Sequence, residues 1–222
     1  MRLDFVSVGK ALAAPARAAM VNVLLDGQAH TAGALGAAAG VTSATTSEHL
    51  ALLVDSGMVT VTKDGRFRRY QIIDHRIASA LETLGRPAAV EVTSLRLSLE
   101  QRRVQMARTC YDHLAGKLGV ALLDMLLRRH WVTPFVDDVT AEGVAGFAAL
   151  GIHIDHLRSC RRPLLRTCVD WTEQREHLAG GLGATMAAAA FDRRWVERKV
   201  GSRGLTLTPL GRDRLSDLGV GS

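Results

Sequence analysis

The chain has few of the features that mark secreted or membrane proteins. Its 222 residues include only 5 prolines, 3 cysteines and 5% aromatic residues. The longest uninterrupted apolar run, ATMAAAAF from Ala184, is far shorter than the roughly 20 residues a transmembrane helix needs. An odd number of widely spaced cysteines does not suit a disulfide framework, and the polar start MRLDFVSVGK does not suit a secretion signal. We therefore expect a cytoplasmic protein with reduced thiols and no membrane association.

The composition that remains is that of an ordinary globular protein, with 47% apolar and 23% charged residues. This length suits one large or two small domains. The net charge of +6 and the pI near 9.8 favour a polyanionic partner. The sequence carries no recognisable phosphate loop, cofactor signature or catalytic motif, so we do not expect an enzyme.

The first 86 residues show helical spacing interrupted by capping residues. Apolar spacing predicts helices over 5–14 and 15–26. Thr31 and Gly40 then suit the two ends of an alanine-rich helix, and Thr42 suits the N-cap of a further helix that stops at Gly57. Two short helices joined by a tight turn predict a helix-turn-helix.

A basic hairpin follows this motif. MVTVTK alternates apolar and polar residues, the pair Asp64 and Gly65 suits a two-residue turn, and RFRRYQI returns. The cations around the turn predict a wing that follows a phosphate backbone, while the hydroxyl-rich helix start suits the major groove or, alternatively, a capping cluster on a solvated helix. The predicted DNA-binding residues are Thr42, Ser43, Thr45, Thr46, Ser47, His49, Lys63, Arg66, Arg68, Arg69 and Tyr70.

The stretch ALGAAAGVTSATTSEHLALLVDSGMVTVTKDGRFRRYQI, residues 34–73, resembles the winged helix-turn-helix of ArsR-type transcriptional regulators. The resemblance covers about the first 85 residues. It implies a homodimer that binds an operator of two half-sites and releases it when an effector binds. The cysteine pair and the carboxylate and histidine sites of metal-sensing members have no clear counterpart in AGALGAAAG or DHRIASALETLG. Any sensing is therefore expected in the rest of the chain.

The C-terminal half is predicted to contain an internal duplication, residues 108–152 and 166–220. RTCYDHLAGKLG in the first copy matches RTCVDWTEQREHLAGGLG in the second, which has six additional residues. The shared unit is predicted to comprise a cysteine-bearing entry, a helix, a tryptophan, a short extended segment and a helix capped by threonine. Two such units would pack about a pseudo-twofold axis.

The duplication pairs Cys110 with Cys168 and His113 with His177 as a tentative site for a thiophilic metal or metalloid ion. Cys110 and His113 are spaced to share one face of a helix, but nine residues separate Cys168 from His177. Two other interpretations are tight structural packing and thiol redox sensing, the latter with Arg108, Arg166 and His113 lowering a thiol pKa. A weaker candidate set is His153, His156 and Cys160.

The sequence thus predicts a mainly α protein with a small β-hairpin wing. Residues 1–86 form the winged helix-turn-helix, and residues 87–222 form a mostly helical, internally duplicated effector and dimerisation domain. The predicted function is that of an effector-released homodimeric repressor that binds double-stranded operator DNA. Alternatives are a regulator that senses thiol redox state or a small molecule, and a DNA-binding protein without an effector.

Overall fold

The computed structural model describes residues 5–85, 95–199 and 202–220. The chain divides into two compact units, residues 1–82 and 83–222. The domain boundary predicted between residues 86 and 87 lies outside the described residues. Among the described helices, none is both long and apolar enough to span a membrane.

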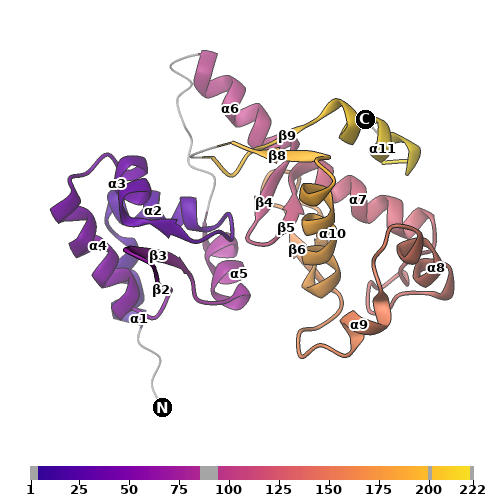
Figure 1. The fold of residues 1–222 in the computed structure, drawn as a ribbon, viewed down its shortest axis with the longest axis horizontal. Helices are drawn as coiled ribbons and strands as arrows, with labels where there is room; N and C mark the ends of the chain where they lie inside the picture. The colour runs from indigo at the N-terminus through magenta and orange to yellow at the C-terminus, as the bar shows by residue number, and fades with distance from the viewer. Residues whose placement is uncertain (1–4, 86–94, 200–201, 221–222) are drawn as a thin grey trace. The chain divides into compact units, whose positions relative to one another are not determined.

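The first unit consists of helices around a three-stranded antiparallel sheet of order β1-β3-β2 (Figure 1). Its elements are α1 (Phe5–Leu12), α2 (Pro15–Leu24), β1 (His30–Thr31), α3 (Ala32–Ala39), α4 (Ser43–Asp55), β2 (Val59–Asp64), β3 (Phe67–Ile72) and α5 (His75–Leu84).

The capping residues predicted from the sequence begin and end these helices. The hydroxyl of Thr31 accepts a hydrogen bond from the backbone N–H of Ala34, and Thr42 does the same for Thr45. Gly40 ends α3 in the left-handed conformation, with φ of 67°. The chain therefore turns between α3 and α4 where the local chemistry predicts it.

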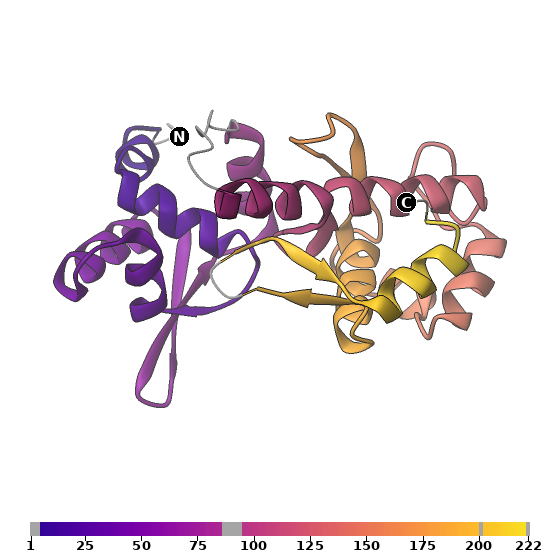
Figure 2. The same cartoon turned by 90° about the horizontal axis from the view of Figure 1, so that it is seen from above.

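The β2–β3 hairpin projects from the helices of the first unit (Figure 2). Asp64 pairs with Phe67, so Gly65 and Arg66 form the turn. The prediction of Asp64 and Gly65 as the turn was wrong by one residue. The positive φ of 58° falls on Gly65, because glycine meets no steric penalty there.

The second unit alternates helices with two-stranded antiparallel hairpins. Its elements are α6 (Leu95–Met106), β4 (Arg108–Cys110), β5 (His113–Ala115), α7 (Gly116–Arg128), α8 (Ala141–Ala149), α9 (Ile154–Arg158), β6 (Arg166–Val169), β7 (Glu176–Ala179), α10 (Gly180–Asp192), β8 (Val196–Arg198), β9 (Leu205–Leu207) and α11 (Pro209–Asp217). The unit is mostly helical, as predicted, but its hairpins were not predicted.

In this unit, the helix that follows each hairpin packs against the other hairpin. Helix α7 follows the β4–β5 hairpin and packs against β7, while α10 follows the β6–β7 hairpin and packs against β5. Apolar side chains from both helices, among them Leu122, Leu126 and Leu182, join one buried core. This arrangement brings the two hairpins side by side, and β5 contacts β7 directly.

Residues 108–152 and 166–220 also share local structure. Trp131 and Trp195 each accept a backbone hydrogen bond from the threonine that caps the next helix, Thr140 and Thr208. Each threonine hydroxyl in turn accepts from the glycine three residues later. These matching contacts agree with the predicted repeat, whose common origin stays a prediction.

Candidate functional site

Helix α4 and the wing enclose a groove of about 560 Å³ on the first unit. Ser47 and Ala51 line it from the helix, and Arg66 and Arg68 line it from the hairpin. The N-terminus of α4 carries exposed hydroxyl side chains, so its positive dipole end and short polar groups are accessible. Asp55 and apolar side chains such as Leu50 and Phe67 complete the groove, so the features that suit nucleic acid are the exposed cations of the hairpin and the accessible start of α4.

The structure divides the predicted DNA-binding residues by exposure. Those with exposed or half-buried side chains are Thr42, Ser43, Thr45, Ser47, His49, Lys63, Arg66, Arg68 and Arg69. The structure corrects the prediction at Thr46 and Tyr70, because both residues are buried, with exposures of only 2% and 8%. The Thr46 hydroxyl donates to the carbonyl of Thr42 and packs where Gly36 leaves room for it, which fixes α4 against α3.

Two of the basic side chains of this surface, His49 and Arg69, already have side-chain partners in the protein. Nδ1 of His49 lies 3.1 Å from a guanidinium nitrogen of Arg17, and Nε of Arg69 donates to Asp64 at 2.5 Å. Lys63, Arg66 and Arg68 are fully on the surface. These three cations are therefore the wing residues best placed to meet phosphates.

A cluster of two cysteines and two histidines lies between the paired hairpins of the second unit. Cys110 is the cross-strand partner of His113 in β4–β5, and Cys168 is the partner of His177 in β6–β7. The expectation that Cys110 and His113 share a helical face was wrong. The hairpin places both side chains on one face of a two-stranded ribbon, and the longer β6–β7 connection does the same for residues nine apart.

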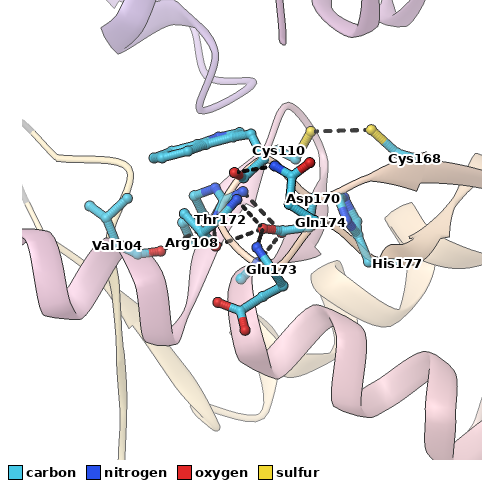
Figure 3. Close-up of polar contacts among 11 residues, drawn as sticks. Val104, Arg108, Cys110, Cys168, Asp170, Thr172, Glu173, Gln174 and His177 are labelled. Carbon is cyan, nitrogen blue, oxygen red and sulfur yellow. Dashed lines mark hydrogen bonds and ion pairs between the residues drawn. The ribbon is translucent and has the colours of Figure 1, made fainter. Parts of the chain in front are cut away.

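The four side chains converge closely. One ligand atom from each of Cys110, His113, Cys168 and His177 can be chosen so that all lie within 4.8 Å of one another. The two sulfurs are 3.9 Å apart and point toward each other (Figure 3). The imidazole centroids are 5.1 Å apart. We define these four residues as the Cys₂His₂ cluster.

A buried ion pair supports the second hairpin behind the cluster. Asp170 and Arg108 are both 0% exposed, and their side chains are 2.9 Å apart. Asp170 also accepts hydrogen bonds from the backbone N–H of Gly116 at 2.6 Å and from the hydroxyl of Thr172 at 2.7 Å (Figure 3). The Arg108 guanidinium stacks 4.4 Å over the ring of Trp171. Arg108 was predicted as a neighbour of the thiols, but it pairs with this carboxylate.

The electrostatics of Asp170 follow from these contacts. Burial alone raises the pKa of Asp170, but the Thr172 hydroxyl, the Arg108 charge and the Gly116 N–H lower that pKa well below its usual range. The carboxylate is therefore ionised. Its Oδ2 lies 3.5 Å from Nδ1 of His177, which turns the opposite ring nitrogen, Nε2, away from the carboxylate.

A more exposed ion pair supports the first hairpin. The Arg162 guanidinium donates two hydrogen bonds to Asp112, one to Oδ2 at 2.5 Å and one to Oδ1 at 3.1 Å. Oδ1 of Asp112 also lies 3.3 Å from Nδ1 of His113. Burial raises the pKa of Asp112, but hydrogen bonds from His113 and Arg162 lower that pKa to about 2. Arg166, which was predicted as a thiol neighbour, is exposed.

The same contacts act on the ligand atoms themselves. Burial lowers the pKa of His113, but hydrogen bonding to Asp112 and interaction with Cys168 raise that pKa overall. A hydrogen bond from the Cys110 thiol stabilises the Cys168 thiolate and lowers the pKa of Cys168. Burial raises this pKa, but the imidazoles of His113 and His177 lower it further, so it falls well below its usual range. Nε2 of His113 and both ring nitrogens of His177 are buried and have no hydrogen-bond partner among the described residues.

Two glycines allow the helices to approach the imidazoles. A Cβ on Gly119 would lie 2.4 Å from the carbonyl oxygen of Leu114 and 3.4 Å from Cβ of His177. A Cβ on Gly183 would lie 2.7 Å from the carbonyl oxygen of Leu178 and 3.4 Å from Cβ of His113. Each helix thus needs a glycine at the point where it crosses the hairpin that precedes it and faces the histidine of the other hairpin.

The sequence places Asp112 and Asp170 at equivalent positions, two residues after the cysteine in both copies, but assigns them no role beside the histidines. Other supporting residues were missed, because Arg162, Trp171 and Thr172 lie outside the shared pattern. The weaker set lies elsewhere, because His153, His156 and Cys160 are exposed around the short helix α9.

Comparison with known proteins covers both units. A helix-turn-helix domain family model matches residues 12–62. The chain is 34% identical over 216 residues to the HTH-type transcriptional regulator YdfF of Bacillus subtilis, and the alignment covers 96% of this chain and 95% of YdfF. This similarity therefore includes the hairpins that carry the Cys₂His₂ cluster.

Other relatives match a smaller share of the chain. The HTH-type transcriptional regulator CmtR of Mycobacterium tuberculosis is 40% identical over 77 residues, which span 35% of this chain and 64% of CmtR. A solved structure of CmtR, described as a cadmium metal-sensor, is 35% identical with a TM-score of 0.33 and covers 40% of this chain and 94% of its own. A homodimeric winged helix-turn-helix domain from Mycobacterium bovis, described as a possible ArsR-family regulator, is 29% identical, with a TM-score of 0.30 over 32% of this chain and 66% of its own.

Proposed function

The chain belongs to the ArsR-type winged helix-turn-helix transcriptional regulators, and from this premise we propose that it is a homodimeric operator-binding repressor released by a metal ion. The ion would bind at the Cys₂His₂ cluster of Cys110, His113, Cys168 and His177. The observation that carries the proposal is the convergence of two sulfurs and two imidazoles within 4.8 Å, in a unit where each imidazole has a carboxylate behind it.

Operator binding would use the groove between α4 and the wing. Lys63, Arg66 and Arg68 are exposed and would neutralise phosphates, which releases counterions and makes the affinity depend on salt. The exposed hydroxyls of Thr42, Ser43 and Ser47 at the start of α4 would enter the major groove. Thr46 and Tyr70 support this surface from below.

Dimerisation would use apolar surface on the first unit. Phe5 and Val6 at the start of α1 are 73% and 66% exposed, although the helix otherwise packs on α2. Large apolar side chains side by side on a surface favour burial by a partner. Light scattering on the purified full chain should give about twice the 23.9 kDa chain mass, and a monomer at micromolar concentration would contradict this part of the proposal.

The ion would act through a coupling free energy between its site and the operator. Couplings of about 1–3 kcal/mol change an affinity about 5- to 150-fold. The test uses a duplex that the chelator-treated protein selects from a random-sequence pool, with fluorescence anisotropy as the readout. Zinc or cadmium should weaken binding to this duplex by a factor in that range. An affinity that no ion changes would refute the effector part of the proposal.

Matched variants test the response to the ion and the binding of the operator separately. Cys168→Ser should abolish the response to the ion, whereas Cys160→Ser should keep it, because Cys160 is exposed and outside the cluster. Arg68→Ala should weaken binding to every sequence and reduce the slope of log affinity against log salt by about one. Arg76→Ala on α5 should leave that slope unchanged, because this exposed arginine lies outside the wing.

A second candidate function is thiol redox sensing, which the 3.9 Å distance between the two sulfurs favours. A disulfide needs sulfurs about 2.05 Å apart, so a closure of less than about 2 Å would join Cys110 and Cys168. Hydrogen peroxide would oxidise the two thiols to a disulfide and be reduced to two waters. A mass decrease of two hydrogens after peroxide treatment, with altered operator affinity and no effect of metal ions, would favour this function over the metal-ion proposal.

A further inference from the structure

We infer that the Cys₂His₂ cluster is built for a divalent, tetrahedral ion of the zinc and cadmium type and not for a trivalent metalloid, with Asp112 and Asp170 as positioning residues that aim the imidazoles at the ion. This inference rests on the proposed function and narrows the class of its effector. Four observations of the second unit carry it: the sulfur separation, the direction of the imidazoles, the charges around them and the number of sulfurs.

The sulfur separation fits a tetrahedral ion. Metal–sulfur bonds of about 2.3 Å in a tetrahedron place the two sulfurs about 3.8 Å apart. The sulfurs of Cys110 and Cys168 are 3.9 Å apart. The cross-strand pairing of each cysteine with its histidine holds this arrangement, so the sulfurs already have the separation that such an ion needs, and one nitrogen of each imidazole lies within 4.8 Å of them.

The direction of the imidazoles identifies the ligand atoms. Nδ1 of His113 faces Asp112, and Nδ1 of His177 faces Asp170, at 3.3 and 3.5 Å. Only the first of these contacts is a hydrogen bond. Both Nε2 atoms, and also Nδ1 of His177, are buried without a hydrogen-bond partner among the described residues. A carboxylate behind a metal-binding histidine fixes the tautomer that leaves the other nitrogen available. An ion bound through both Nε2 atoms would give these two nitrogens the partner they lack.

The charges of the surrounding residues favour a divalent ion. Asp112 is balanced by Arg162 and Asp170 by Arg108, so the supporting groups carry no net charge. The two cysteine thiolates would bring a charge of −2 into a largely buried site, and a divalent ion cancels that charge. A tetrahedral set of two sulfurs and two nitrogens is also a ligand set that suits zinc. Binding needs both cysteines as thiolates and both imidazoles neutral, so any proton that these four side chains carry would be released to the solvent.

The number of sulfurs disfavours a trivalent metalloid. Arsenite exchanges its three oxygens for three thiolates, but the cluster contains two. The third cysteine of the chain, Cys160, is exposed near α9, and its sulfur lies 3.4 Å from the carbonyl oxygen of His156. A metalloid bound to two sulfurs would also leave both Nε2 atoms without a partner.

The test titrates the chelator-treated full chain with cobalt(II), zinc and arsenite. We expect one cobalt per chain, with the intense visible bands of tetrahedral cobalt and a sulfur-to-cobalt charge-transfer band, and we expect zinc but not equimolar arsenite to displace it. Tight arsenite binding with weak cobalt binding would overturn the inference and leave a metalloid-responsive regulator intact. Binding of none of the three would overturn both the inference and the metal-ion effector of the proposed function.

The positioning role of the carboxylates is tested at the more exposed one. Asp112→Asn should keep the tetrahedral cobalt spectrum and lower the zinc affinity about 10- to 100-fold, because a mispositioned imidazole still binds, but less tightly. Asp124→Asn is the matched control, because Asp124 is similarly exposed and pairs with Arg175 at 2.7 Å without contacting either histidine. Equal zinc affinities for the two variants would overturn the positioning role, since loss of a surface ion pair alone would explain both.

Discussion

The two hairpins of the second unit supply equivalent ligands but support them differently. In β6–β7 the carboxylate behind the histidine is Asp170, which forms a fully buried ion pair with Arg108. In β4–β5 it is Asp112, which is 26% exposed and pairs with Arg162 at 29% exposure. The two hairpins therefore present equivalent ligands although the ion pairs behind them differ in burial. The support behind the second hairpin is fully buried, whereas the ion pair behind the first is partly open to solvent, although the strands of the first hairpin are themselves buried.

The six residues Trp171–Glu176 account for this difference. They lengthen the β6–β7 connection, yet Cys168 still pairs with His177. Trp171 covers the guanidinium of Arg108, and the Thr172 hydroxyl and the Glu173 N–H donate to Asp170. In β4–β5, two residues connect the strands, with Tyr111 at a φ of 59°. The inserted segment thus buries the ion pair and leaves the ligand geometry unchanged.

The largest expected effect is the loss of the buried carboxylate. Asp170→Asn would leave Arg108 buried without its counter-charge, which should lower the free energy of unfolding of the second unit by about 3–5 kcal/mol. Asp112→Asn should lower it by about 0–1 kcal/mol, because its ion pair is partly solvated. Urea denaturation in the presence of chelator, followed by tryptophan fluorescence, measures this unit alone, since Trp131, Trp171 and Trp195 all lie in residues 83–222.

The pH dependence of this difference has a definite sign. The pKa of Asp170 is lowered in the folded chain, so the stability it contributes is complete above the ordinary carboxyl value of 3.8 and is lost as the pH falls toward the folded pKa. The gap between the wild-type chain and Asp170→Asn should therefore be constant near neutral pH and shrink below about pH 4. A gap that widens on acidification would contradict the assignment of an ionised Asp170.

The next largest effect concerns the glycines that bring each helix against the hairpins. Gly119→Ala and Gly183→Ala would each place a Cβ under 3.0 Å from a backbone carbonyl, so both should lower unfolding stability by about 1–3 kcal/mol, with Gly119→Ala the more severe. Gly181→Ala is the control on the same helix as Gly183. Its nearest contact would be 3.5 Å, so better helix propensity should raise stability by up to about 1 kcal/mol.

The same variants test whether the two halves of the Cys₂His₂ cluster contribute equally to zinc binding. If Gly119→Ala and Gly183→Ala lower zinc affinity to a similar degree, both imidazoles depend on their facing helix. A loss confined to Gly119→Ala, which faces His177, would show that the hairpin with the fully buried ion pair, β6–β7, determines the affinity alone. Destabilisation by Gly181→Ala as large as that by Gly183→Ala would instead refute the close-approach explanation.

The sequence predicted the first unit well because its signals are local. Thr31, Gly40 and Thr42 each act within a few residues of their own position, as caps and a left-handed helix end. The exceptions, Thr46 and Tyr70, have side chains whose direction depends on packing against α3 and within the sheet. Residue type alone could not distinguish them from the exposed hydroxyl and wing residues beside them.

The candidate site was predicted in part because its ligands recur in both copies. The repeated cysteine and histidine identified Cys110, His113, Cys168 and His177, but not the hairpins that join them. Strands of three and four residues are too short for apolar alternation to show. The pairing of Asp170 with Arg108 joins positions 62 residues apart in the sequence, so no local signal could predict it.

The smallest expected effect tests the partly exposed ion pair behind the first hairpin. Arg162→Ala removes the cation that helps to hold the pKa of Asp112 at about 2, so that pKa should rise toward its ordinary value of 3.8. The unfolding free energy should change by less than about 1 kcal/mol, because the ion pair is partly solvated. Carboxyl-carbon NMR titration measures the first quantity, and urea denaturation measures the second. A loss as large as that from Asp170→Asn would show that both hairpins depend equally on their ion pairs, and the contrast between a buried and an open support would then be wrong.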